Sequence, residues 1–355
     1  MFYHTMHSPR GSGSSFVIGA ENEGGGFMIG EGFIPKNEVY IGVKKHNVLK
    51  CLPFFENEDI PDAEENFDIG KVQNRKTFMR KYHKKELNRK LLFSTDRWIT
   101  EDFTFELITP SDGIKYPDTS SYIDVKNSIV PAICARFIVH NKENYPITGF
   151  FGVQGLKGVY PLSSVCPGSL MGAAGAGGYG FALDALKYRN ICFEIGDFSP
   201  VSAFSRNERG FYRNCEMGGF CFDVAPDQTT TIEFVLGWYY YGIATRGLHK
   251  MPYYYTNFFS NLEEVLLYTI KHYSQYALDA EKQDAYLSAL PISEERKFFI
   301  AQSVHCYWAS TMLFDDGGRP RYIVNEGSYM MMNTFDLSID HLFYECMSQP
   351  WTVKN

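Results

Sequence analysis

Short apolar or alternating segments recur along the first two-thirds of the chain, and clusters of Gly, Pro, Asn and Asp separate them. Segments of this length, rich in β-branched and aromatic residues, are typical of strands. No helical period intervenes, so the pattern predicts a large antiparallel β-sandwich rather than alternating β and α units. The six clearest expected strands cover residues 16–18, 39–43, 103–108, 133–139, 147–153 and 232–236.

The hydrophobic period changes near Asn257 from two residues to three or four. Ser260 and Glu263 have the spacing of a capping box, which is typical of the beginning of a helix. Apolar residues then follow at helical spacing as far as Tyr276. A second helix is expected to begin at Ser293, because two glutamates follow it where the helix dipole favours negative charge.

The chain ends inside a helical pattern. A turn at residues 315–320 precedes a short apolar segment, and a third helix is expected from about Thr334 to Cys346. No closing helix follows, so we expect the helical domain to be truncated. The predicted division is a β-sandwich domain at residues 1–250, a helical linker at 251–290, and the start of a helical domain at 291–355.

The high aromatic share, 16% of the residues, is the unusual feature of the composition. Aromatic side chains pack well in sheets, and their flat faces also suit the apolar faces of sugar rings. A net charge of −7 argues against nucleic acid and against anionic membranes as partners. The longest apolar run, residues 234–244, is too short to span a membrane, and the N-terminus has no signal-peptide pattern, so we expect a cytoplasmic protein.

The eight cysteines are scattered and include no Cys-x-x-Cys pair. This spacing argues against a zinc site and against a disulfide scaffold. His4 and His7 do not make a metal site either, because no third ligand lies at a suitable spacing. We therefore expect no metal and no cofactor, and a structural or substrate-contacting role for the two histidines.

Two other motifs have ordinary explanations. Residues 175–180 match the dinucleotide-binding pattern G-x-G-x-x-G, but loop sequence precedes them, so we expect a loop or a tight corner of the sheet. Residues 71–90 contain nine Lys or Arg and one acidic residue, whereas residues 56–68 contain seven acidic residues. We expect these two segments to neutralise each other as solvated loops rather than to bind phosphate.

The most informative segment contains Glu326, Asn333 and Asp336 around a Met-rich loop. An apolar wall raises the pKa of a carboxyl group or desolvates it, and glycosidases prepare acids and nucleophiles in this way. The same residues also have a structural interpretation, in which Asn333 and Asp336 cap the last helix and Glu326 is a surface residue. From the residues alone, both interpretations stay open.

The sequence from Tyr322 to Glu345, with residues 349–355 after it, closely resembles the nucleophile region of glycoside hydrolase family 52. Shorter segments resemble the same family in the same order, at residues 7–9, 39–43, 52–56, 150–152 and 258–265. The resemblance implies an N-terminal β-sandwich, a helical linker and an (α/α)6 barrel that holds the active site. The chain is then the N-terminal part of such an enzyme and stops inside the barrel.

The family resemblance also implies an activity, the release of xylose from the non-reducing ends of xylo-oligosaccharides with retention and without a metal. Glu326 falls on the family's nucleophile. Asp336 matches a position that holds sugar hydroxyls in the related family 116 glycosidases, and Asn333 is expected to contact substrate beside it. Two positions depart from the family, since Ser328 stands where a second acid is usual and Met330 where Arg is usual.

The family's acid/base aspartate lies further along the barrel and has no counterpart in this chain, so the fragment is expected to be inactive. Its expected partner is a xylo-oligosaccharide, and a homodimer of the full-length form is left open. Two alternatives also stay open: a non-catalytic oligosaccharide-binding β-sandwich, and a family 116-like β-glucosidase. If barrel helices are missing, apolar residues of the helices present should be exposed, namely Phe298, Val304, Trp308, Leu342 and Phe343.

Overall fold

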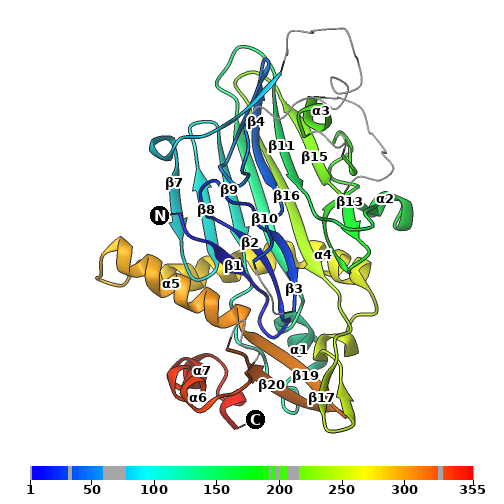
Figure 1. The fold of residues 1–355 in the computed structure, drawn as a ribbon, viewed down its shortest axis with the longest axis vertical. Coiled ribbons are helices and arrows are strands. Elements are labelled where there is room, and N and C mark those ends of the chain that lie inside the picture. Colours follow the sequence, from blue (N-terminus) through cyan, green and yellow to red (C-terminus); the bar gives the residue numbers. More distant parts are fainter. Residues whose placement is uncertain are drawn as a thin grey trace.

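The computed structural model describes residues 2–30, 34–58, 77–191, 193–196, 200–205, 216–326 and 331–354. Two large sheets form its centre, and helices lie beside them and toward the C-terminal end of the chain (Figure 1). The predicted combination of large antiparallel sheets with helices is confirmed, and the described ranges contain seven α-helices. Three of these helices lie between strands of the sandwich, where no helix was predicted.

The larger sheet has eight strands in the order β12-β13-β14-β16-β10-β9-β8-β7, with every neighbouring pair antiparallel. Its central pair, β10 and β16, forms the longest ladder among the described strands. The strands are β7 (Asn88–Leu91), β8 (Thr95–Ile99), β9 (Phe103–Ile108), β10 (Ala132–His140), β12 (Tyr160–Pro161), β13 (Leu170–Gly175), β14 (Tyr179–Asp184) and β16 (Thr229–Trp238).

The second sheet has five strands in the order β15-β11-β4-β5-β6. Its pairs are antiparallel except for β5 and β6, which run parallel, so the sandwich is not purely antiparallel as predicted. The strands are β4 (Val39–Lys45), β5 (Val48–Cys51), β6 (Phe78–Lys81), β11 (Ile147–Val153) and β15 (Gly218–Val224).

Phenylalanine side chains fill the space between the two sheets. Phe151 of β11 stacks against Phe105 of β9 with ring centroids 6.2 Å apart, and its centroid lies 4.8 Å from that of Phe234 on β16. All three rings are fully buried. Much of the aromatic content therefore builds the core of a two-layer sandwich, where large apolar surfaces removed from water give the main stabilisation.

A small third sheet connects the N-terminus with the C-terminal helices. It contains β1 (Thr5–His7), β2 (Ser14–Ile18) and β3 (Gly26–Ile29) in sequential order. Strand β1 packs against α5 (Glu294–Ala309), and Ser12 pairs with Met312 of β19 (Thr311–Asp316). With β2 included, all six predicted strands are present in the structure.

Helix α4 (Leu262–Ser288) covers the outer face of the larger sheet, where it packs against β10, β14 and β16. Its cap lies one residue later than predicted. Asn261 accepts a hydrogen bond from the backbone N–H of Glu264 at 2.8 Å, and the Glu264 carboxylate accepts one from the N–H of Ser260 at 2.9 Å. Helix α5 begins as predicted, because the Ser293 hydroxyl accepts a hydrogen bond from the N–H of Arg296.

The region predicted to be all-helical contains a β-hairpin, formed by β19 and β20 (Arg319–Val324). Its turn lies where predicted, with Gly317 and Gly318 at positive φ, a conformation that glycine adopts without strain. The third predicted helix is divided in two, α6 (Phe335–Asp340) and α7 (Leu342–Ser348), and the short 3₁₀ helix η5 (Thr352–Lys354) follows.

The expected exposure of the last helices is wrong for two residues. Phe298 and Trp308 are buried, since the face of α5 that carries them packs against the sandwich. Val304 is half-buried. Leu342 is 36% exposed and Phe343 is 78% exposed, so the prediction of exposed apolar residues holds for α7.

The segment that matches the dinucleotide pattern is a hairpin turn, as expected. Residues 175–180 connect β13 to the antiparallel β14, and the N–H of Gly178 donates to the carbonyl of Gly175. No helix begins there.

The remaining described elements are α1 (Tyr122–Ser128), α2 (Leu162–Val165), α3 (Pro200–Ser205), β17 (Ala244–Arg246), β18 (His249–Met251), η2 (Lys84–Glu86) and η3 (Tyr254–Asn257).

Charge neutralisation between the acidic and basic segments falls mostly on residues 59–76, outside the described residues. The described part of the basic segment, residues 77–90, forms β6, η2 and β7, so the expectation of a solvated loop is wrong there. In it, Arg89 pairs with Asp96 of β8 instead of with the acidic segment.

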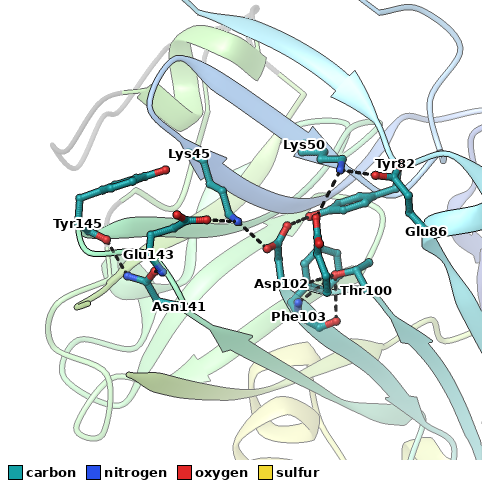
Figure 2. A network of polar contacts seen from close by, with 11 residues as sticks. Lys45, Lys50, Tyr82, Glu86, Thr100, Asp102, Phe103, Asn141, Glu143 and Tyr145 are labelled. Atoms are coloured by element: carbon teal, nitrogen blue, oxygen red, sulfur yellow. Dashed lines mark hydrogen bonds and ion pairs between the residues drawn. The ribbon is translucent and has the colours of Figure 1, made fainter. Parts of the chain in front are cut away.

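Polar side chains join the two sheets at one end of the sandwich (Figure 2). Asp102, in the β8–β9 turn, accepts a hydrogen bond from the Tyr82 hydroxyl at 2.6 Å and pairs with Lys45 of β4 at 2.7 Å. Lys45 also pairs with Glu143 at 2.8 Å. The Lys50 ammonium lies 4.3 Å from the centre of the Tyr82 ring. This network fixes β4 of the smaller sheet to the β8–β9 turn of the larger one.

Candidate active site

Glu326 lies just beyond β20, and the backbone at this point pairs with residues 331–333. The N–H of Glu326 donates to the carbonyl of Met331 at 2.8 Å, and Asn325 pairs with Met332. The N–H of Asn325 in turn donates to the carbonyl of Ser310 at the end of α5. These backbone bonds fix the position of Glu326 relative to α5, while residues 327–330 lie outside the described part of the chain.

The half-buried side chain of Glu326 lines an open depression of about 380 Å³ beside α5 and α6. Its described lining is formed by Phe299, Gln302, Ser303, Cys306, Tyr307, Ser310, Asn325, Glu326, Leu337 and His341. Glu326 is the sole carboxylate among these residues. None of the described residues donates a hydrogen bond to its side chain.

Asn333 has a structural contact at its side chain. Its Oδ1 accepts a hydrogen bond from the N–H of Val324 at 2.8 Å, and its own N–H donates to the Val324 carbonyl at 2.8 Å. Its φ of 50° lies in the left-handed region, which Asn tolerates better than most residues. Asn333 does not cap the last helix, because Thr334 occupies the N-cap position of α6.

Asp336 lies in the first turn of α6, and its side chain is exposed. The Thr334 hydroxyl and the backbone N–H groups at the start of the helix lower the pKa of this carboxyl. Neither Asp336 nor Asn333 belongs to the described lining of the depression beside Glu326. Asn333 lines a neighbouring depression instead, and Leu337 borders both. The structure therefore brings the three predicted residues near one helix start but not into one depression.

The expected apolar wall around Glu326 is not formed by the described methionines. Met331 and Met332 are both exposed. Met330 and Ser328, at which the sequence departs from the family pattern, lie outside the described residues. The lining around Glu326 is mixed instead and contains aromatic rings as well as hydroxyl and amide groups.

A tyrosine–glutamate cluster beside the depression was missed by the sequence analysis. The Tyr307 hydroxyl lies 2.9 Å from both Glu345 Oε1 and the Tyr322 hydroxyl, and the Thr352 hydroxyl donates to Glu345 Oε2 at 3.1 Å. Burial raises the pKa values of Tyr307 and Tyr322, so both hydroxyls stay protonated. The ring of Tyr307 lies 4.6 Å from that of His341. Because these residues come from four different elements, sequence spacing gave no signal for the cluster.

The side chains of His4 and His7, the two histidines near the N-terminus, contact other protein side chains. His7 is fully buried, with Nε2 3.3 Å from Asp96 and its ring 5.2 Å from that of His305. Burial lowers the pKa of His7, which favours the neutral ring. His4 lies 3.0 Å from Glu23 at the surface. Within the described ranges, no group of three His, Cys, Asp or Glu side chains is arranged to hold a metal ion.

Comparison of the sequence with known proteins identifies the family of the chain. Residues 16–355 match the sequence profile of Glycosyl hydrolase family 52, so the chain belongs to that family of glycoside hydrolases. Two relatives described as Beta-xylosidase, both from Geobacillus stearothermophilus, are 29% and 28% identical to it over its whole length. The chain spans 59% and 51% of the lengths of these two relatives.

Among solved structures, the chain is similar to a putative kojibiose phosphorylase from human microbiome. The match has a TM-score of 0.32 and 11% identity, and it covers 86% of this chain and 39% of the other.

Even α4, the longest described helix, contains no stretch apolar enough to cross a membrane, and the same holds for the other helices described.

Proposed function

We propose that this chain is the nucleophile-bearing part of a retaining β-xylosidase that removes xylose from the non-reducing ends of xylo-oligosaccharides. The observation that carries the proposal is the position of Glu326, a carboxylate that lines an open depression and accepts no hydrogen bond from the described residues. Membership of the family and similarity to two β-xylosidases support the substrate class.

In the proposed reaction, a Glu326 oxygen attacks the anomeric carbon while the bond to the leaving oxygen breaks. The leaving oxygen takes a proton from an acid on a second carboxyl group, about 5–5.5 Å from the first in retaining enzymes. Water then attacks the same carbon of the xylosyl ester, the bond to the Glu326 oxygen breaks, and the second carboxyl group, now the base, takes the proton from the water. The described lining contains no second carboxylate, so we expect the 355-residue chain alone to show no turnover.

Asp336 and Asn333 are proposed to contact sugar hydroxyls next to the attacked carbon. Hydrogen bonds of this kind lower the barrier when they strengthen in the transition state. Asp336 suits the role because its carboxyl, whose pKa is lowered at the start of α6, is ionised and exposed. For Asn333, the NH₂ group is the available donor, since its Oδ1 is held by Val324.

The test uses an enzyme in which the chain is extended to family length with the remaining barrel of a relative. Glu326→Ala should abolish turnover of an aryl β-xyloside, because a retaining mechanism has no other route to the covalent intermediate. Azide should partly restore product formation and give the α-xylosyl azide, since the small anion fills the space of the lost carboxylate. Glu295→Ala, at an exposed glutamate in the first turn of α5, is the matched control and should keep full activity.

Near-normal activity of Glu326→Ala, or a β-configured azide product, would show that Glu326 is not the nucleophile. Faster turnover of an aryl β-glucoside than of the xyloside by the unmodified enzyme would contradict the substrate part of the proposal alone.

A further inference from the structure

A second cavity, of about 550 Å³, lies between the sandwich and helices α4, α5 and α7. It is distinct from the depression beside Glu326, because the two are lined by different faces of α5. Ile300, Val304 and Trp308, each four residues apart, face this cavity, whereas Phe299 and Ser303 face the other. The proposed hydrolysis does not use this cavity.

Arg10, which follows the His-Ser-Pro motif, lines this cavity and is only 5% exposed. Its guanidinium donates to the Ser111 carbonyl at 2.6 Å, to the Tyr344 hydroxyl at 2.8 Å and, at 3.5 Å, to the amide oxygen of Gln349. The guanidinium carbon also lies 4.8 Å from the centre of the Trp308 ring. All of these partners are neutral.

A buried charge of this kind is unusual, because removing an ion from water is costly unless an opposite charge compensates it. Among the described residues, no carboxylate lies within 4.0 Å of Arg10, and Nε has no hydrogen-bond partner. Lys115 also lines the cavity, so its two cations outnumber the single acid, Asp112. The charge balance favours an anion as ligand, and a guanidinium suits a carboxylate in particular.

The rest of the lining fits a sugar ring. Phe93 and Tyr286 provide accessible aromatic surface, which packs well against the apolar faces of sugars. Ser111, Gln283 and Ser348 provide hydroxyl and amide groups that can bond to ring hydroxyls. A mostly apolar concave site with a few convergent polar groups is typical of small-molecule binding.

We propose that this cavity binds a sugar that carries a carboxylate, a uronic acid such as a branch on an oligosaccharide, with the carboxylate at Arg10. The sugar part of this inference rests on the proposed function, and the carboxylate part rests on Arg10 alone. Such a site would hold an acidic oligosaccharide on the enzyme at a place separate from the attacked bond.

The test is titration calorimetry on the 355-residue chain with glucuronic acid, glucose and acetate. Glucuronic acid and glucose differ only at C6, which makes them a matched pair for the carboxylate, and acetate is the carboxylate without the sugar. Glucuronic acid should bind at least about tenfold more tightly than either of the others, since a buried charge pair is worth more than one factor of ten. Equal affinity for glucose, or for acetate, would overturn the inference.

Two variants locate the binding. Arg10→Met keeps the apolar stem and should reduce glucuronic acid affinity to the level of glucose, whereas Arg319→Met, at an exposed arginine in β20, should change nothing. Ile300→Trp should fill the cavity and weaken glucuronic acid binding without touching Arg10, so the inference stays testable if Arg10→Met does not fold. Unchanged binding in Ile300→Trp would place the ligand elsewhere and refute the site. Because no turnover is measured here, failure of this inference and failure of the Glu326 proposal are distinguishable.

Discussion

Removal of the buried Arg89–Asp96 pair should destabilise the chain more than removal of any exposed ion pair. The pair is bidentate, with Arg89 Nε 2.9 Å and Nη2 2.7 Å from the two Asp96 oxygens, and both side chains are almost completely buried. It also joins the larger sheet to the N-terminal segment, because Arg89 donates to the Tyr3 carbonyl and to the Thr5 hydroxyl.

Arg89→Met keeps the apolar stem over the Trp98 ring, 4.5 Å from the guanidinium carbon, but leaves Asp96 buried without its cation. His7 is the remaining contact of that carboxylate among the described residues, and burial favours the neutral form of His7. Breaking a buried pair from one side costs about 3–5 kcal/mol of unfolding free energy. The matched control is Arg246→Met, in an ion pair with Asp316 whose arginine is largely exposed, and it should cost at most about 1 kcal/mol.

Urea unfolding followed by far-ultraviolet circular dichroism measures both effects. The double variant Arg89→Met/Asp96→Asn, which removes both charges, decides the cause, since it should be more stable than the sum of the single effects by about 1–3 kcal/mol. Strictly additive single effects, or equal losses for Arg89→Met and Arg246→Met, would refute the reasoning that an uncompensated buried charge produces the loss.

Three further predictions concern other parts of the chain. Burial raises the pKa of Asp284 to about 6, above its unfolded value of about 4, so its contribution to stability is full below pH ~4 and is lost as the pH rises through ~6. The stability difference between Asp284→Asn and the unmodified chain, measured by urea unfolding, should therefore shift in favour of the variant across this pH range, and a flat difference would contradict it. Tyr82→Phe removes the hydrogen bond to Asp102 and should cost about 1.5–3 kcal/mol in the same assay, whereas Tyr241→Phe at an exposed tyrosine should cost almost nothing. The exposed residues of α6 and α7 should bind a hydrophobic dye, and Phe335→Ser/Phe343→Ser should reduce the dye fluorescence, while unchanged fluorescence would place the dye elsewhere.

The sandwich could be predicted because its strands carry a strong local signal. Residues 133–139 and 147–153 are long apolar segments bounded by turn residues, and both became central strands. The parallel pairing of β5 and β6 could not be predicted, since it depends on how the chain returns to the sheet and not on the pattern within either strand. The β19–β20 hairpin was missed because Pro320 and the acidic residues beside the turn weaken the strand pattern.

The helical part shows where periodicity is ambiguous. Phe298 and Trp308 have the spacing of a buried face, but spacing does not identify the element that covers the face. We expected this face of α5 to be left uncovered by absent helices. Instead, Phe298 is covered by the sandwich and the N-terminal segment, where it lies near Arg89 and Tyr3. The break at His341 has no Gly or Pro to mark it. The contact between the His341 and Tyr307 rings is a tertiary one, which lies outside the information in the local sequence.

The candidate nucleophile differs from the structural carboxylates in how its oxygens are used. Asp96 has both oxygens held by Arg89, and Asp284 accepts hydrogen bonds from the Ser94 N–H at 2.7 Å and the Thr95 hydroxyl at 2.5 Å. Their positions are fixed, and neither is available to a ligand. Among the described residues, Glu326 is held through its backbone N–H, which donates to the Met331 carbonyl, and its side chain lines an open depression.

A nucleophile needs this combination, because its attack requires a fixed approach and an oxygen that no protein group already occupies. A shifted pKa alone would have selected Asp284, because burial raises the pKa of its carboxyl, but both of its oxygens are used in holding α4 to the turn between β7 and β8. The long motif around Glu326 and the position of its side chain at an open depression are independent observations, and both support the proposal that Glu326 is the nucleophile.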